Sequence, residues 1–311
     1  MEFWNIWNNN FLYISNIIAL IYEYYIIEKH FTKPKLELDI DFCKKIAMVS
    51  IPFAITSILY TIYYSIDIIM LTNIIGDYAT GIYNATYKLI SVLTIFYSIY
   101  IAVISPVMSK FFKNDKKLLL ICYEKSIKYL MLIMIPIAIS TMIYSDEIIF
   151  LIYGHEYDAA SSVLSILIWT VCLLFINGAG NTLLNASHKE VTVTKIYAVA
   201  AIFNIVFNFI MIPYLSYDGA AITTVLSDLL IMIIQIYAIY KIGFRTNKTL
   251  YFDLIKIIIG SVTVGVILSI LKLNLFIAIP VAIIIYLVII VIFKLFDDND
   301  KYIIKEIMNK N

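Results

Sequence analysis

Four ionisable side chains interrupt apolar stretches of the sequence, and they are the first candidates for chemistry. They are Glu23, Asp67, Lys88 and Asp228. A charge at the centre of a bilayer costs about 3 kcal/mol on insertion scales, so a charged residue inside a membrane span indicates a function or a close partner. Glu23 lies near the end of its stretch and is expected at the membrane interface. The other three lie deeper.

Asp67 and Lys88 are expected at similar depth on consecutive stretches. Asp67 shares one helical face with Thr56, Tyr60 and Tyr63, because the spacings between them are four, three and four residues. Two interpretations remain open. In the first, Asp67 and Lys88 form an ion pair that lets both enter the membrane. In the second, Asp67 binds a cation or a proton and Lys88 contacts an anionic substrate.

Amide and hydroxyl side chains recur at helical spacing later in the chain. They are Asn177, Asn181 and Asn185 in one stretch, Asn204 and Asn208 in the next, and Thr224, Asp228 and Gln235 in the one after. Hydrogen bonding between membrane helices is the ordinary explanation for such side chains. Asn204, Asn208 and Thr224 also carry oxygen atoms of the kind that hard cations such as Na⁺ take as ligands.

The composition requires membrane helices to position these residues. Of the 311 residues, 62% are apolar and 14% are charged, against about 45–50% and about 25% in soluble domains. The mean hydropathy of +0.91 is too high for a water-soluble core of this size. The predicted fold class is therefore an all-α, polytopic membrane protein. A disulfide scaffold, a nucleic-acid binder and a disordered tail protein are excluded.

Nine apolar stretches long enough to cross a bilayer are predicted as transmembrane helices. They cover residues 11–27, 46–75, 81–109, 129–145, 161–186, 196–213, 220–240, 254–271 and 276–296.

The placement of Lys and Arg predicts the orientation of these helices. Of the 23 basic residues, 21 fall on one side of the expected membrane, and Lys272 alone falls on the other. The positive-inside rule then puts the N-terminus outside and the C-terminus in the cytoplasm. Cys43 and Cys122 are expected to face the cytoplasm and Cys172 to lie within a span, so no disulfide is expected.

No constellation of residues in the sequence indicates an enzyme. The histidines, His30, His155 and His188, lie at membrane ends, and none forms a pair with metal-ligand spacing. No glycine begins a phosphate-binding P-loop. We therefore predict a protein that is not an enzyme and that carries no cofactor or metal. A membrane-embedded glycosyltransferase or acyltransferase is the enzyme alternative, and its acidic residues would come from the external segment 146–160.

Several short motifs resemble one family of transporters. Ser50-Ile-Pro-Phe-Ala54, followed by Tyr63-Tyr-Ser-Ile-Asp67, resembles the seventh helix of the polysaccharide-biosynthesis flippases. These are exporters of lipid-linked oligosaccharides of the O-antigen and teichoic-acid type, related to multidrug and toxin extrusion proteins. Similar motifs follow in the family's order: Gly81-Ile-Tyr-Asn-Ala-Thr-Tyr-Lys88, then Asn181-Thr-Leu-Leu-Asn185, then Asn204 and Asn208 before Pro213, then Gly219-Ala-Ala-Ile-Thr-Thr224.

The resemblance implies an architecture of two six-helix lobes with a substrate cavity between them, used by alternating access. Residues 1–45 would be the last helix of the first lobe and a cytoplasmic linker, 46–245 the complete second lobe, and 246–311 two extra helices and a cytoplasmic tail. The family's first five helices have no counterpart in the sequence. The chain is therefore expected to be inactive alone. Three interpretations remain open: a truncated or mis-started gene product, a half-transporter that needs the missing first-lobe half or another membrane subunit, and a vestige.

The resemblance also implies site residues and partners. Asp67, Asn204, Asn208 and Thr224, with the Ala220 backbone, would bind a coupling Na⁺ or H⁺. Asn208 stands where a relative carries an acidic residue, which would weaken the site or shift coupling to protons at Asp67. Further positions would line the substrate cavity: Asn84, Lys88, Asn181 and Asp228.

The expected partners are membrane lipid and a polyprenyl-pyrophosphate-linked oligosaccharide, with no nucleic acid. Two alternatives remain open for the function. They are a multidrug antiporter that moves organic cations, and a structural membrane subunit that transports nothing.

Overall fold

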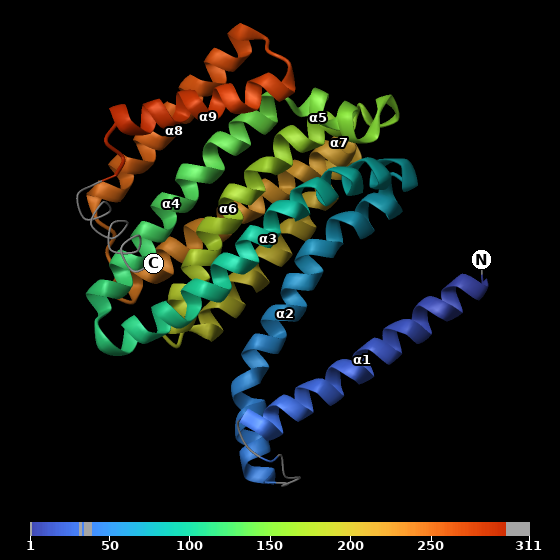
Figure 1. The fold of residues 1–311 in the computed structure, drawn as a ribbon, viewed down its shortest axis with the longest axis vertical. Helices are drawn as coiled ribbons and strands as arrows, with labels where there is room; N and C mark the ends of the chain where they lie inside the picture. The colour runs from blue at the N-terminus through green and yellow to red at the C-terminus, as the bar shows by residue number, and fades with distance from the viewer. Residues whose placement is uncertain (1, 31–32, 34–38, 297–311) are drawn as a thin grey trace. The chain divides into compact units, whose positions relative to one another are not determined.

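The computed structural model of the chain describes residues 2–30, 33 and 39–296. All regular structure within these residues is helical, which confirms the predicted fold class (Figure 1). The α-helices are α1 (Glu2–His30), α2 (Ile40–Ile74), α3 (Asp77–Asn114), α4 (Lys116–Ile143), α5 (Ser145–Tyr153), α6 (Ala160–Ala186), α7 (Glu190–Lys241), α8 (Lys248–Leu271) and α9 (Leu275–Ile292), with a short 3₁₀ helix at His155–Tyr157.

The chain divides into two compact units, Met1–Ser50 and Ile51–Asn311. The first contains α1 and the start of α2. The second contains the remainder of α2 and all later helices, and it carries all the candidate site residues.

Seven helices in the described part of the chain are long and apolar enough to cross a membrane: α2, α3, α4, α6, α7, α8 and α9. They cover eight of the nine predicted spans, because α7 contains two of them. The ninth, 11–27, falls on α1, which is not among the seven. The protein is thus a multi-pass membrane protein.

The chain reverses direction inside α7. Ser216 has φ 52° and ψ −131°, outside the helical region, three residues after Pro213. A continuous helix would separate Asn208 from Thr224 by roughly 24 Å, since a helix rises about 1.5 Å per residue. Both side chains instead contact the same carboxylate. α7 is therefore two helical halves that fold back on each other, and the expected external connection 214–219 is a tight bend.

Within the second unit, α6 lies at the centre. It packs against α7, α3 and α4, and most of its residues are buried. α8 packs on α4, and α9 packs on α8, on the far side of α4 from α3 (Figure 1). The central position of α6 brings both halves of α7 into contact with the helices that carry the candidate polar residues.

Two charged residues one turn apart on α4 hold the start of α8. Lys128 Nζ lies 2.9 Å from Asp253 Oδ2. Glu124 Oε1 accepts a hydrogen bond from the backbone N–H of Asn247, the N-cap residue of α8. Residues at positions i and i+4 face the same way from a helix, so one face of α4 makes both contacts.

Candidate functional site

A buried carboxylate, Asp67, is the centre of the candidate site. Its side chain on α2 is only 2% exposed. Oδ2 accepts a hydrogen bond from the Thr224 hydroxyl at 2.7 Å and another from the Tyr83 hydroxyl at 2.9 Å. Oδ1 accepts from Asn208 Nδ2 at 2.5 Å. Because all three partners are donors, they suit a carboxylate that only accepts. α2, α3 and both halves of α7 meet at this one side chain.

Two asparagines extend this cluster along the first half of α7. Asn208 Nδ2 also donates to Asn204 Oδ1 at 3.0 Å, and neither side chain has any exposed surface. Within the described residues, Asn204 Nδ2 and Asn208 Oδ1 are buried and have no hydrogen-bond partner. The carbonyl oxygen of Ala220 lies 3.0 Å from the Thr224 hydroxyl oxygen. The structure therefore brings together Asp67, Asn204, Asn208 and Thr224, the four residues expected to bind the coupling cation.

Asp228 forms a neighbouring cluster one helical turn after Thr224. It is buried, and its Oδ1 accepts a 2.9 Å hydrogen bond from the hydroxyl of Tyr63. The same hydroxyl lies 3.4 Å from the Thr224 carbonyl oxygen. Asn177 Nδ2 donates to the backbone carbonyl of Asp228 at 3.1 Å. Tyr63 and Asp67 are themselves one turn apart on α2, so the two carboxylate clusters share the same pair of helices.

The other expected cavity residues do not join these clusters. Asn181 donates to the Tyr197 hydroxyl at 2.7 Å and accepts from Gln235 Nε2 at 2.7 Å, linking α6 to both halves of α7. Hydrogen bonding between helices, the ordinary explanation for this asparagine series, thus holds for Asn177 and Asn181. Asn84 is half-buried and Lys88 is exposed.

The interpretation of Asp67 and Lys88 as an ion pair is wrong. No salt bridge joins these residues in the described part of the chain, and Asp67 is surrounded by neutral donors instead. Similar depth on neighbouring helices does not bring two side chains together when they lie on different helical faces. Asp67 faces α7, whereas Lys88 points away from the packed interior.

Tyr83 is a partner of Asp67 that the sequence analysis did not assign to the site. It is fully buried, and its ring stacks on that of Tyr87 with centroids 5.9 Å apart. The available signal was its position, immediately before Asn84 in the motif at the start of α3. Because the sequence contains 25 tyrosines, the residue type alone did not distinguish Tyr83.

The oxygen atoms of the cluster suit a cation with a preference for oxygen ligands. Among the residues that the structure describes, no group of three or more His, Cys, Asp or Glu side chains could hold a metal ion. The available ligands are one carboxylate, one hydroxyl, two amide oxygens and a backbone carbonyl. One carboxylate balances a single positive charge, which fits a monovalent cation or a proton better than a transition metal.

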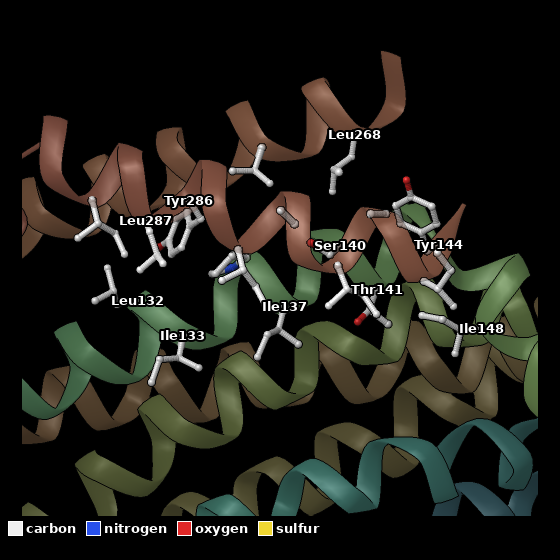
Figure 2. A pocket seen from close by; sticks show the side chains of 18 of the residues that line it. Leu132, Ile133, Ile137, Ser140, Thr141, Tyr144, Ile148, Leu268, Tyr286 and Leu287 are labelled. Atoms are coloured by element: carbon white, nitrogen blue, oxygen red, sulfur yellow. The ribbon is translucent and has the colours of Figure 1, made fainter. Parts of the chain in front are cut away.

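An apolar cavity of about 720 Å³ lies between α4, α8 and α9. Ile133 and Ile137 line it from α4, and Tyr286 and Leu287 line it from α9 (Figure 2). Its described lining contains no carboxylate, lysine or histidine. It shares no lining residue with the site around Asp67.

Comparison with known proteins identifies one matching family and two relatives. A family described as polysaccharide biosynthesis protein matches residues 10–162. An uncharacterized membrane protein of Methanocaldococcus jannaschii is 30% identical over 243 residues, 75% of this chain and 47% of the relative. A probable low-salt glycan biosynthesis flippase of Haloferax volcanii is 24% identical over 177 residues, 56% of this chain and 38% of the relative.

A solved structure has a similar fold. The inward closed conformation of the lipid II flippase MurJ matches with a TM-score of 0.70 at 16% identity, over 86% of this chain and 58% of that one. The chain spans about half the length of the proteins it matches. The resemblance that the sequence motifs indicated is confirmed by these matches.

Proposed function

Because this chain is a relative of the polysaccharide flippases, we propose that it forms the second lobe of a transporter for lipid-linked glycans. The substrate is a polyprenyl-pyrophosphate-linked oligosaccharide, moved across the cytoplasmic membrane by cation-coupled alternating access. The proposal of cation coupling rests on one observation: Asp67 is buried where α2, α3 and both halves of α7 meet. A ligand that changes the contacts of this carboxylate therefore acts on four helical segments together.

The coupling cation binds at Asp67. Its ligands are the carboxylate, the Thr224 hydroxyl and the amide oxygens of Asn204 and Asn208. Asn208 now turns its nitrogen to Asp67 and leaves its oxygen buried without a partner in the described residues. Rotating this amide by half a turn exchanges donor for acceptor. The cluster then has two states. In one, the side chains hydrogen-bond to one another; in the other, their oxygen atoms coordinate a cation. The cation drives a conformational change only if it binds the two lobe orientations with different affinities.

Lys88 faces the substrate. An exposed lysine within a predicted membrane span is costly against lipid, but it is stable against water in a cavity. Asn84 lies one turn earlier on the same face of α3 and is half-buried. A lysine there attracts the pyrophosphate of the substrate. The opposite wall of the cavity comes from a first lobe, supplied by another part of the same protein or by another membrane subunit.

The test is a flipping assay on the native protein, tagged at its chromosomal C-terminus and purified with any partner that stays bound. It is reconstituted in liposomes with a fluorescent polyprenyl-pyrophosphate oligosaccharide, with and without a Na⁺ or a proton gradient. We expect gradient-dependent flipping that Asp67→Asn abolishes in protein that still folds, as a cooperative thermal unfolding transition shows. Flipping that persists unchanged in Asp67→Asn would exclude the coupling role of Asp67.

The same vesicles separate the alternative functions. Lys88→Gln should reduce flipping, whereas Lys110→Gln, an exposed lysine near the end of the same helix, should not. Efflux of an organic cation without glycan flipping would establish the multidrug antiporter instead. The absence of both flipping and efflux, in vesicles that contain every bound partner, would establish that the protein is a structural subunit.

A further inference from the structure

A small cavity of about 20 Å³ lies beside Asp228, between α2, α3, α6 and α7. Its polar wall consists of Asp228, Thr224, Thr94, Thr170 and three tyrosines. A cavity holds one water molecule once its volume exceeds about 10–15 Å³ by this measure. The space at Asp228 is therefore suited to a single water or to an ion of the same size.

The carboxylate of Asp228 accepts fewer side-chain hydrogen bonds than that of Asp67 does. Asp67 accepts three side-chain hydrogen bonds within the described residues, from Tyr83, Asn208 and Thr224. Asp228 accepts one side-chain hydrogen bond, from Tyr63, and it has no cationic partner in the part of the chain that the structure describes. A buried charge without a counter-charge is strongly unfavourable. The cavity at Asp228 is the place where a counter-charge fits.

The hydroxyl groups around the cavity are free to act as ligands. The Thr94 hydroxyl donates to the Ser91 carbonyl at 2.6 Å, and the Thr170 hydroxyl donates to the Leu167 carbonyl at 2.7 Å. Each hydroxyl has one hydrogen, so its oxygen lone pairs remain available. The rings of Tyr64 and Tyr87 add faces that attract a cation. One carboxylate among neutral oxygens matches one positive charge.

We infer that Asp228 and the hydroxyl-lined cavity beside it form a second binding site for a dehydrated monovalent cation of the size of Na⁺. This inference deepens the proposed function and rests on it for the site's role in coupling. Thr224 connects the two sites: its hydroxyl donates to Asp67 at 2.7 Å, and its carbonyl oxygen lies 3.4 Å from the Tyr63 hydroxyl that contacts Asp228. A cation at either carboxylate thus affects the other through Tyr63 and Thr224.

The test is equilibrium binding of radioactive ²²Na⁺ to the purified full chain, with choline as the competing inert cation. We expect Asp228→Asn and Asp67→Asn each to bind one Na⁺ fewer than the wild type, and the double variant to bind none. Asp146→Asn, an exposed carboxylate outside both clusters, should bind as the wild type does. Thr170→Val keeps both carboxylates, and it should weaken the affinity of one site by roughly tenfold, as expected for one lost ligand.

The outcomes separate this inference from the proposed function. Sodium binding that is unchanged in Asp228→Asn and in Thr170→Val overturns the second site and leaves the site at Asp67 intact. A single bound Na⁺ that is lost only in Asp228→Asn supports the second site and removes Asp67 from cation binding. If Asp228→Asn does not fold, the Na⁺ affinity of Thr170→Val alone tests the second site. No Na⁺ binding by the wild type overturns this inference, whereas flipping driven by a proton gradient would still support the transporter.

Discussion

The hydroxyl of Thr224 donates a 2.7 Å hydrogen bond to the carboxylate of Asp67, which lies 157 positions earlier in the chain. This contact joins the second half of α7 to α2. Asn208, from the first half of α7, contacts the other oxygen of the same carboxylate. The bend at Ser216 is what allows both halves to reach it. The candidate site and the packing of these helices therefore depend on the same few hydrogen bonds.

Two adjacent threonines allow this contact to be measured. Thr224→Val removes a donor from a buried carboxylate and should lower the free energy of unfolding by about 1–3 kcal/mol. Thr223→Val is the matched control. The Thr223 hydroxyl is buried and has no hydrogen-bond partner within the described residues, so a methyl group there should be neutral or stabilising. Thermal unfolding of the purified protein in detergent compares the two. Equal destabilisation by both changes would contradict the importance of the Asp67 contact.

The bend in α7 should be sensitive to one added methyl group. A Cβ on Gly219 would lie 2.6 Å from the backbone oxygen of Met211 and 2.8 Å from its carbon. Backbone atoms cannot move aside as a flexible side chain can, so Gly219→Ala should destabilise the protein by about 1–3 kcal/mol, typical of overpacking. Because the bend positions Asn208 and Thr224, Na⁺ binding should weaken as well.

Gly81→Ala provides the control for this change. Gly81 lies within α3, and a Cβ there would meet nothing within 4 Å. Alanine favours a helix over glycine by about 0.5–1 kcal/mol, so Gly81→Ala should be neutral or slightly stabilising. An unfolding midpoint for Gly219→Ala equal to that of Gly81→Ala would show that the bend can relax.

The ion pair between α4 and α8 should contribute measurably to stability. Lys128 and Asp253 have side chains 5% and 21% exposed, so Asp253→Asn leaves a buried lysine without this counter-charge. We expect a loss of about 1–3 kcal/mol, below the value for a fully buried pair because water reaches Asp253. Asp158→Asn is the control, since its contact with His155 is on the surface. Similar unfolding midpoints for both variants would exclude a stabilising role for the buried pair.

The proposed orientation can be checked with the native cysteines. Cys43 is exposed, Cys122 is half-buried and Cys172 is buried. A membrane-impermeant maleimide should modify Cys43 in inverted vesicles, where the cytoplasmic face is outside, and leave it unmodified in intact cells. Cys43→Ser should remove the rapid labelling, and Cys172 should stay unmodified on both sides. Labelling of Cys43 in intact cells would reverse the orientation that the distribution of Lys and Arg predicts.

The sequence by itself determined the class of the protein and the residues worth examining. The length of an apolar stretch is set by the thickness of the bilayer, so eight of the nine predicted spans fall on helices that can cross a membrane. The cost of polar groups in a membrane singled out Asp67, Asp228 and the asparagines of α7. Helical periodicity also identified the faces that carry them, because it depends only on residues within one helix.

The tertiary structure decided which of these faces meet. Nothing local to α2 indicates that Asp67 contacts Thr224, Asn208 and Tyr83, or that Lys88 stays apart from it. These pairings follow from the central position of α6 and from the bend at Ser216, where two helices that the sequence showed as consecutive become neighbours around one carboxylate. Contacts between residues more than 140 positions apart depend on the packing of all the helices between them, which no single segment encodes.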